Sequence, residues 1–256
     1  MPATRYKLRQ LRLQYDAEAL ARIGGEMAAN GQIGLKVEKE RFSGSSLEFL
    51  NDFTHLEAIA IYGISRGISV LGKMLNLRSV ALCGLSTKDL GFLNKLEHLE
   101  ELWIQGLRLK GWDSLGQLRQ VKVITLFNLR QDDFGFLGVM ESLQIIHFDR
   151  CSGLVSIPSL HKLSVLRRLI LDTVNRLEDL SGAASAPVLE DVVVMGADAI
   201  EPKAFDCLIG HSTLCGILPG IDLMDSMRYR DLVSRLPEDL LMDGFYGTPN
   251  EEFTVR

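Results

Sequence analysis

Hydrophobic residues recur along this chain at a fixed spacing. In each unit, three apolar residues are separated first by two variable residues and then by one, and units start 22 residues apart at Leu77, Leu99, Val121 and Leu143. The alternation of apolar and variable residues at the end of each unit is typical of a strand with one buried face. A single unit cannot bury its own apolar edge, so the pattern predicts a stack of coils.

The period continues toward both ends of the chain. Further units start at Leu56, Leu166 and Leu189, which makes seven clear repeats, and Leu214 starts a candidate closing unit. Upstream, a shorter apolar pattern indicates two irregular coils, at Leu35 and Val37 and at Leu8, Leu11 and Leu13. The whole array is therefore predicted to be one elongated repeat structure.

The second half of each unit is also regular. The turn after each predicted strand usually carries a residue that tolerates a positive φ angle: Gly63, Gly84, Gly106, Asn128 or Gly196. The two 23-residue units have Arg150 and Thr173 there instead, so we expect their tight turn slightly later. Behind the turn, apolar residues spaced by three, such as Leu90, Leu93 and Leu96, predict 3₁₀ or short irregular segments.

Both ends of such a stack need a cap over the exposed core. We expect Asp16 to cap a helix that runs to about Ala29, and Asp225 to cap a second helix that ends near Leu236, before Pro237. The predicted organisation is a capping region with a strand and a helix over 1–34, a repeat array over 35–218, and a C-terminal cap and tail over 219–256. Residues 247–256 have no apolar pattern and are expected to fray.

The 22-residue period with short back segments resembles the leucine-rich repeats of bacterial internalins, over about residues 35–218. It is similar also to the repeats of a eukaryotic phosphatase regulator. The resemblance implies an α/β solenoid, a leucine-rich-repeat arc with a concave parallel β-sheet, short convex segments and helical caps. It also implies protein binding without catalysis, in a divergent intracellular bacterial member. Where internalins carry a ladder of buried asparagines, this chain is apolar, at Ile64, Leu85, Leu129, Cys151 and Val174.

Charge and composition narrow the classes of partner. The formal net charge is −5, which argues against a general nucleic-acid or anionic-membrane surface. No apolar run approaches the ~18 residues of a membrane span, and residues 1–10 lack the apolar segment of a secretory signal. The four cysteines do not form a disulfide framework, although a Cys207–Cys215 pair stays open; Cys151 is expected inside and Cys83 outside. These features predict a cytoplasmic protein.

The variable positions of each strand predict a binding surface, because they point away from the leucines. Large aromatics stand there beside charged groups, which is the usual composition of a protein-binding patch. The candidate partner-binding residues on the concave face are Tyr62, Glu101, Trp103, Gln105, Phe127, Ile145, His147, Asp149, Arg168 and Asp172. We therefore expect a monomeric, non-enzymatic module that holds one protein partner and acts by inhibition, neutralisation (toxin immunity is one version) or scaffolding.

Other interpretations remain open. His147, Asp149 and Asp172 would share one face and could bind a divalent metal or act as an acid/base pair. Against this, no further His or Cys has ligand spacing nearby, the face should be open to water, and Arg168 could simply neutralise the acids. We expect no catalytic residue, metal or cofactor. A third alternative is a structural role by self-assembly. A fourth is that the aromatics form no partner site, either because the arc is shallow or because the C-terminal segment folds over the rings.

Overall fold

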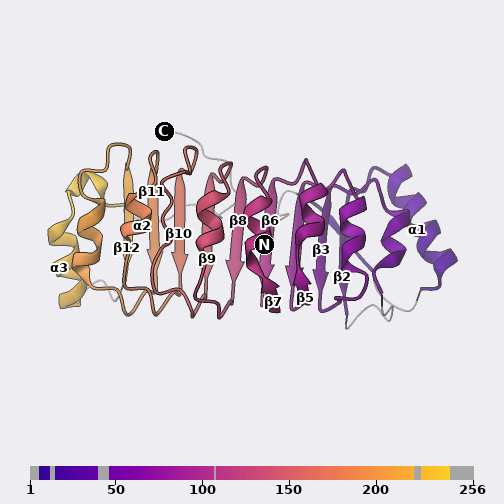
Figure 1. Ribbon diagram of the computed structural model, residues 1–256, viewed down its shortest axis with the longest axis horizontal. Helices are drawn as coiled ribbons and strands as arrows, with labels where there is room; N and C mark the ends of the chain where they lie inside the picture. The colour runs from indigo at the N-terminus through magenta and orange to yellow at the C-terminus, as the bar shows by residue number, and fades with distance from the viewer. Residues whose placement is uncertain (1–5, 12–14, 40–45, 107, 222–225, 243–256) are drawn as a thin grey trace. The chain divides into compact units, whose positions relative to one another are not determined.

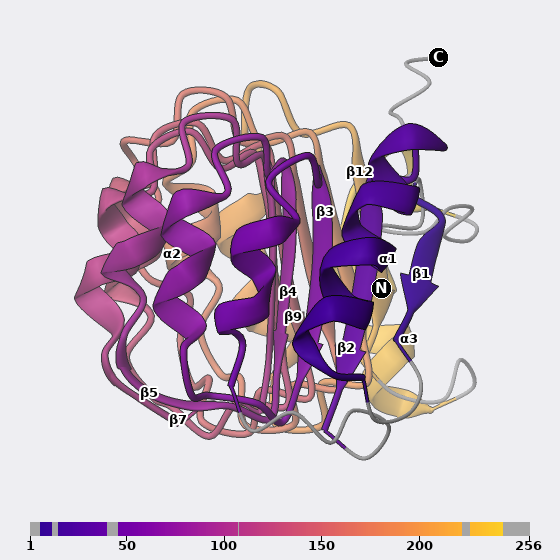
Figure 2. The same cartoon turned by 90° about the vertical axis from the view of Figure 1, so that its right-hand side faces the viewer.

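The computed structural model describes residues 6–11, 15–39, 46–106, 108–221 and 226–242. The chain divides into two compact units, residues 1–121 and residues 122–256. Within each unit, every coil contributes one strand to a parallel sheet and returns through a short segment behind it (Figure 1). Figure 2 shows those return segments as a separate layer behind the strands.

In the described part of unit 1, five parallel strands neighbour one another in the order β1-β2-β3-β4-β6. Their bounds are β1 (Leu8–Gln10), β2 (Gly34–Glu38), β3 (Ala58–Tyr62), β4 (Ser79–Cys83) and β6 (Glu101–Gln105). A second, two-stranded parallel sheet pairs β5 (Ser86–Asp89) with β7 (Arg108–Gly111). The back layer consists of the 3₁₀ segments η1 (Glu48–Asp52), η2 (Ile68–Lys73), η3 (Gly91–Lys95) and η4 (Trp112–Gln117).

Among the described residues of unit 2, five parallel strands follow one another in chain order. They are β8 (Val123–Phe127), β9 (Ile145–Asp149), β10 (Arg168–Asp172), β11 (Asp191–Met195) and β12 (Gly216–Gly220). Its short segments are η5 (Gly135–Val139), the single-turn helix α2 (Ser181–Ala184), η6 (Pro202–Leu208) and η7 (Glu238–Leu240). The parallel strands and short back segments confirm the predicted class of fold.

The repeated leucine positions form the core of each unit. In the coil that starts at Leu99, for example, Leu99, Leu102 and Ile104 are buried, as are the back residues Leu115 and Leu118. The position after each strand turn is buried and apolar too, at Ile64, Leu85, Leu129, Cys151 and Val174, so the predicted apolar spine is present. Cys151 lies inside as expected, and its thiol donates to the carbonyl of Leu126 at 3.1 Å.

The turn after each strand corrects one expectation. Arg150 and Thr173 have φ angles of +53°, like the glycines at this position, so the tight turn is not delayed in the longer coils. Both residues donate their backbone N–H to the carbonyl of the last strand residue in the next coil, Arg150 to Asp172 at 2.9 Å and Thr173 to Met195 at 2.6 Å, as Gly63, Gly84, Asn128 and Gly196 do. This continued ladder holds the left-handed backbone, and the extra residue is accommodated further on.

The N-terminal cap is as predicted. Helix α1 (Ala17–Ala29) starts at Asp16, whose carboxylate accepts the backbone N–H of Ala19 at 2.7 Å. Gly24 is buried in this helix, and a Cβ there would lie 2.9 Å from the carbonyl oxygen of Asp52. The glycine that weakens the helix therefore allows the cap to approach η1 closely.

The C-terminal cap differs in one detail. Helix α3 (Met227–Arg235) begins after Ser226, whose hydroxyl accepts the N–H of Tyr229 at 3.0 Å, so Ser226 rather than Asp225 is the N-cap. A serine with extended backbone satisfies a free N–H of the first turn as well as an aspartate does. Asp225 itself, the tail at 247–256 and Leu13 lie outside the described residues. The division of the chain into three parts at 34/35 and 218/219 stays a prediction. No described helix is long and apolar enough to cross a membrane.

Candidate functional site

The strand register places the predicted surface positions in straight columns. We call the sheet side turned away from the leucine core the outward face of each unit. On unit 1, Ala60 pairs with Ala81 and Ala81 with Trp103; on unit 2, Thr125 pairs with His147 and His147 with Ile170. Outward residues at the same position of successive units are therefore direct neighbours on adjacent strands of each unit.

On unit 1, the outward face carries Tyr62, Glu101, Trp103 and Gln105. Tyr62 is partly exposed, the ammonium of Lys36 lies 4.7 Å from the centre of its ring, and burial is the main cause of a raised pKa of its hydroxyl. Trp103 and Gln105 are also partly exposed, whereas Glu101 is buried, with 8% of its surface accessible. The rings of Tyr62 and Trp103 on unit 1 thus remain partly exposed.

On unit 2, the outward face carries the other six candidates. Phe127 is partly exposed, and the guanidinium of Arg150 lies 5.3 Å from its ring centre. Ile145 is buried against Ile170 and Val193, and the partly buried Val123, Met195 and Leu218 pack on this group. Ile170 and Val193 were not among the predicted site residues. Their signal was in the sequence, because three successive units place β-branched apolar residues at positions where a wet strand would be polar.

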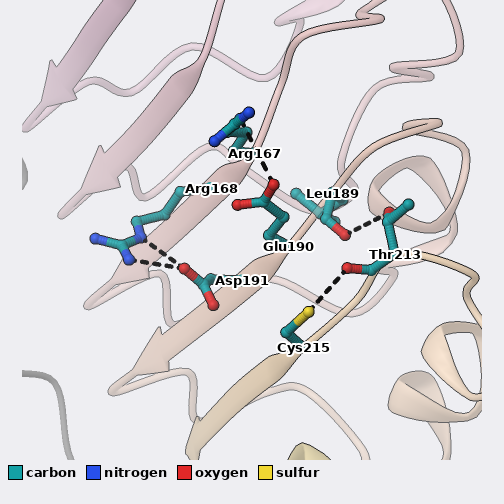
Figure 3. Close-up of polar contacts among 7 residues, drawn as sticks. All are labelled: Arg167, Arg168, Leu189, Glu190, Asp191, Thr213 and Cys215. Atoms are coloured by element: carbon teal, nitrogen blue, oxygen red, sulfur yellow. Dashed lines mark hydrogen bonds and ion pairs between the residues drawn. The ribbon is translucent and has the colours of Figure 1, made fainter. Parts of the chain in front are cut away.

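Arg168 forms an ion pair with Asp191, its neighbour in register on β11. Its Nε and terminal nitrogen donate to one carboxylate oxygen of Asp191 at 3.1 Å and 2.7 Å, and both side chains are largely covered (Figure 3). Directly before these two strands, Arg167 and Glu190 form a second ion pair at 3.5 Å (Figure 3). The suggestion that Arg168 neutralises Asp149 and Asp172 is therefore not needed to explain its position.

His147, Asp149 and Asp172 do lie together. His147 and Asp149 are two apart on β9, and Asp149 pairs in register with Asp172 on β10. Each of the three offers a ligand atom within 4.8 Å of the others. Burial lowers the pKa of His147 to about 4, partly opposed by the charge of Asp172, and burial together with Asp172 raises the pKa of Asp149.

The expectation of a face open to water is wrong for part of each unit. Among the described residues, four polar outward residues are buried, namely Ser79, Glu101, Thr125 and His147. Side chains in a column stand only about 4.8 Å apart, so each covers part of its neighbours. The partly exposed members of the predicted set are Tyr62, Trp103, Gln105, Phe127, Asp149, Arg168 and Asp172.

The cysteines offer no reactive thiol on this face. Cys83 occupies an outward position beside Tyr62, as predicted, but it is buried, which raises its pKa to about 11. A thiol with such a pKa stays protonated at neutral pH and is a weak nucleophile. Cys207 and Cys215 are exposed and unpaired, so the open question of a bridge between them is answered by two free thiols.

Solved structures reveal which known fold this arrangement matches. The leucine-rich-repeat domain of the type III effector XopL superposes with a TM-score of 0.53 at 14% sequence identity, covering 91% of this chain and 74% of that domain. The chain has the leucine-rich-repeat fold. Two Listeria monocytogenes internalins are also similar: internalin C2 (18% identity, 75% and 73% covered, TM-score 0.48) and inlF (16%, 83% and 72%, TM-score 0.41). No protein-family model and no curated protein matches the sequence.

Proposed function

We propose that this leucine-rich-repeat protein is a non-enzymatic interaction module that binds one protein partner through the outward faces of its strands. The observation that carries the proposal is that each unit presents partly exposed aromatic side chains on its outward face beside charged residues, with Tyr62 and Trp103 on unit 1 and Phe127 on unit 2. Aromatic side chains of this kind dominate protein interfaces, because each buries a large area at a small entropic cost.

Two of the aromatic rings have a cation stacked on them. Lys36 lies over Tyr62 in unit 1, and Arg150 lies over Phe127 in unit 2. A cation over a ring restricts the rotamers of both side chains before any partner arrives. A partner that covers these rings therefore loses less side-chain entropy than it would on a flexible surface.

The surroundings of the rings fit the anatomy of an interface. On unit 2, the apolar group around Ile145 and Ile170 is flanked by Asp149, Asp172 and the Arg168–Asp191 pair. An apolar centre with a polar rim is how non-obligate interfaces are built. Such a module acts by occupying a surface of its partner in the cytoplasm, and it thereby inhibits, neutralises or scaffolds that partner. Neutralisation of a toxin is the most concrete version.

A crosslinking experiment tests the proposal. A photoreactive amino acid replaces Trp103 in one variant and Leu75, which is 57% exposed and lies outside the columns, in the control. A partner identified from the Trp103 crosslink is then purified, and its affinity is measured for wild type, for Trp103→Ala/Phe127→Ala and for Leu75→Ala. Each buried aromatic anchor contributes a few kcal/mol, so we expect the double variant to bind at least ~100-fold more weakly while it keeps its circular dichroism spectrum.

Three results would contradict it. Equal affinity of the double variant and wild type would move the interface off these faces. Crosslinks that form equally from position 75 would mean that capture is not specific to the outward face around Trp103. Loss of the folded spectrum in the double variant would make the two rings structural, as the alternative with covered aromatics holds.

A further inference from the structure

We infer that His147, Asp149 and Asp172 form a binding site for a single divalent transition-metal ion such as Zn²⁺. The three side chains come from the two adjacent strands β9 and β10, and their ligand atoms lie within 4.8 Å of one another. This function goes beyond protein binding and does not depend on it.

The buried histidine is the first reason. Only 7% of His147 is accessible, and neither Nδ1 nor Nε2 has a hydrogen-bond partner within the described part of the chain. Buried polar nitrogens are nearly always hydrogen-bonded, because leaving them unsatisfied costs free energy. A metal ion bound by one ring nitrogen removes that deficit. The sequence argument against a metal assumed an open, wet face, and the burial of His147 removes that objection.

The two carboxylates are the second reason. Oδ1 of Asp149 is buried and receives no hydrogen bond from the residues that the structure describes, although the guanidinium of Arg150 lies 3.7 Å away. Asp149 and Asp172 stand side by side in register, so their charges repel one another across the column. A divalent ion balances two carboxylates and a neutral imidazole to zero net charge, and it converts this repulsion into attraction.

The hydrogen bonds that hold Asp172 in place are the third reason. The hydroxyl of Thr173 donates to Oδ1 of Asp172 at 2.8 Å, and the backbone N–H of Arg150 donates to the Asp172 carbonyl at 2.9 Å. These bonds fix both the strand and the carboxylate. Carboxylates that hold metals are commonly oriented by such outer hydrogen bonds.

The ligand set favours some ions over others. Imidazole nitrogen suits zinc and other late first-row metals, whereas calcium and magnesium prefer oxygen ligands alone. A tetrahedral zinc site with bonds of about 2.1 Å sets its ligand atoms roughly 3.4 Å apart. The three atoms must therefore close by at most ~1.4 Å, which small side-chain rotations provide.

The test is a calorimetric titration of chelator-treated, tag-free full-length protein with ZnCl₂, and with MgCl₂ for comparison. Wild type is expected to bind one Zn²⁺ per chain and no Mg²⁺. His147→Phe keeps the ring shape without nitrogens, and Asp172→Asn removes a charge; each is expected to lose at least ~100-fold in affinity, and Thr173→Val about 10-fold. His161→Ala, at an exposed turn histidine, is the matched control and is expected to bind as wild type does.

The coordination sphere gives a second readout. Co²⁺ added in place of Zn²⁺ is expected to give visible ligand-field bands that disappear in His147→Phe. Absence of saturable Zn²⁺ binding by wild type overturns the inference, and so does unchanged affinity in a folded His147→Phe or Asp172→Asn protein. If His147→Phe does not fold, Asp172→Asn decides by itself, because it keeps the volume of the side chain.

Discussion

The two units build the same coil but join neighbouring coils differently just after the strand turn. In unit 1, this part of the coil forms the second sheet, in which Ser86 pairs with Arg108. In unit 2, the matching stretch brings Gly153 against Arg130 and Gln131, and a Cβ on Gly153 would lie 1.9 Å from the carbonyl oxygen of Gln131. Strand pairing sets the spacing of coils in unit 1, whereas glycine permits close backbone contact in unit 2.

The two units also differ in the residue types at their strand turns. Unit 1 uses Gly63, Gly84 and Gly106 for its left-handed residues, and unit 2 uses Asn128, Arg150 and Thr173 before it returns to Gly196. The φ angles nevertheless lie between +52° and +72° in all seven. The ladder of hydrogen bonds between coils therefore imposes the conformation, and the residue type changes only its cost.

The largest loss of stability is expected for a substitution at the glycine that the backbone of a neighbouring coil approaches most closely. Gly153→Ala should destabilise the protein by at least ~3 kcal/mol, because the new methyl overlaps a backbone oxygen that cannot rotate away. Gly72→Ala, whose Cβ in unit 1 would lie 2.8 Å from the carbonyl of Phe92, should cost about 1–2 kcal/mol. Urea unfolding of both variants measures the difference. Equal losses would mean that the two units pack their coils with the same tolerance.

A smaller effect is expected from exchanging the turn residues. Thr173→Gly should stabilise unit 2 by about 1 kcal/mol, because a β-branched residue is strained at φ +53°. Gly84→Ala should destabilise unit 1 by about 1 kcal/mol, from the backbone alone, since nothing lies within 4 Å of its Cβ position. Thermal unfolding of each single variant checks both signs. A destabilised Thr173→Gly protein would show that the Thr173 hydroxyl bond to Asp172 outweighs the strain.

The smallest effect concerns ion pairs between neighbouring coils. The Arg168–Asp191 pair of unit 2 is short and largely covered, at 2.7 Å, whereas Arg78 of unit 1 lies 3.8 Å from Glu57 and is more exposed. Double-mutant cycles with Met at the arginine and Asn or Gln at the acid should give a coupling of about 1 kcal/mol in unit 2 and below ~0.5 kcal/mol in unit 1. Similar coupling energies in both cycles would mean that the ion pairs of the two units do not differ in strength.

The sequence predicted much of the fold because the repeat is a local code. The leucine spacing gave the strands, their register and the apolar spine, and an N-cap residue with a helical apolar face gave α1. It missed the Ser226 cap, because aspartate and serine stand next to each other and both can cap a helix. It also placed the turn of the long coils too late, because residue preference at Arg150 and Thr173 was weighed without the ladder that overrides it.

The sequence by itself determined which side chains point outward and which lie beside one another, since periodicities of two and 22 fix both. Only the tertiary structure decided how much water reaches them: it buried His147 and Glu101, gathered Ile145, Ile170 and Val193 into an apolar group, and paired Arg168 with Asp191. The physical reason is that direction follows from one strand, whereas exposure and pairing depend on side chains that three or more stacked strands bring together.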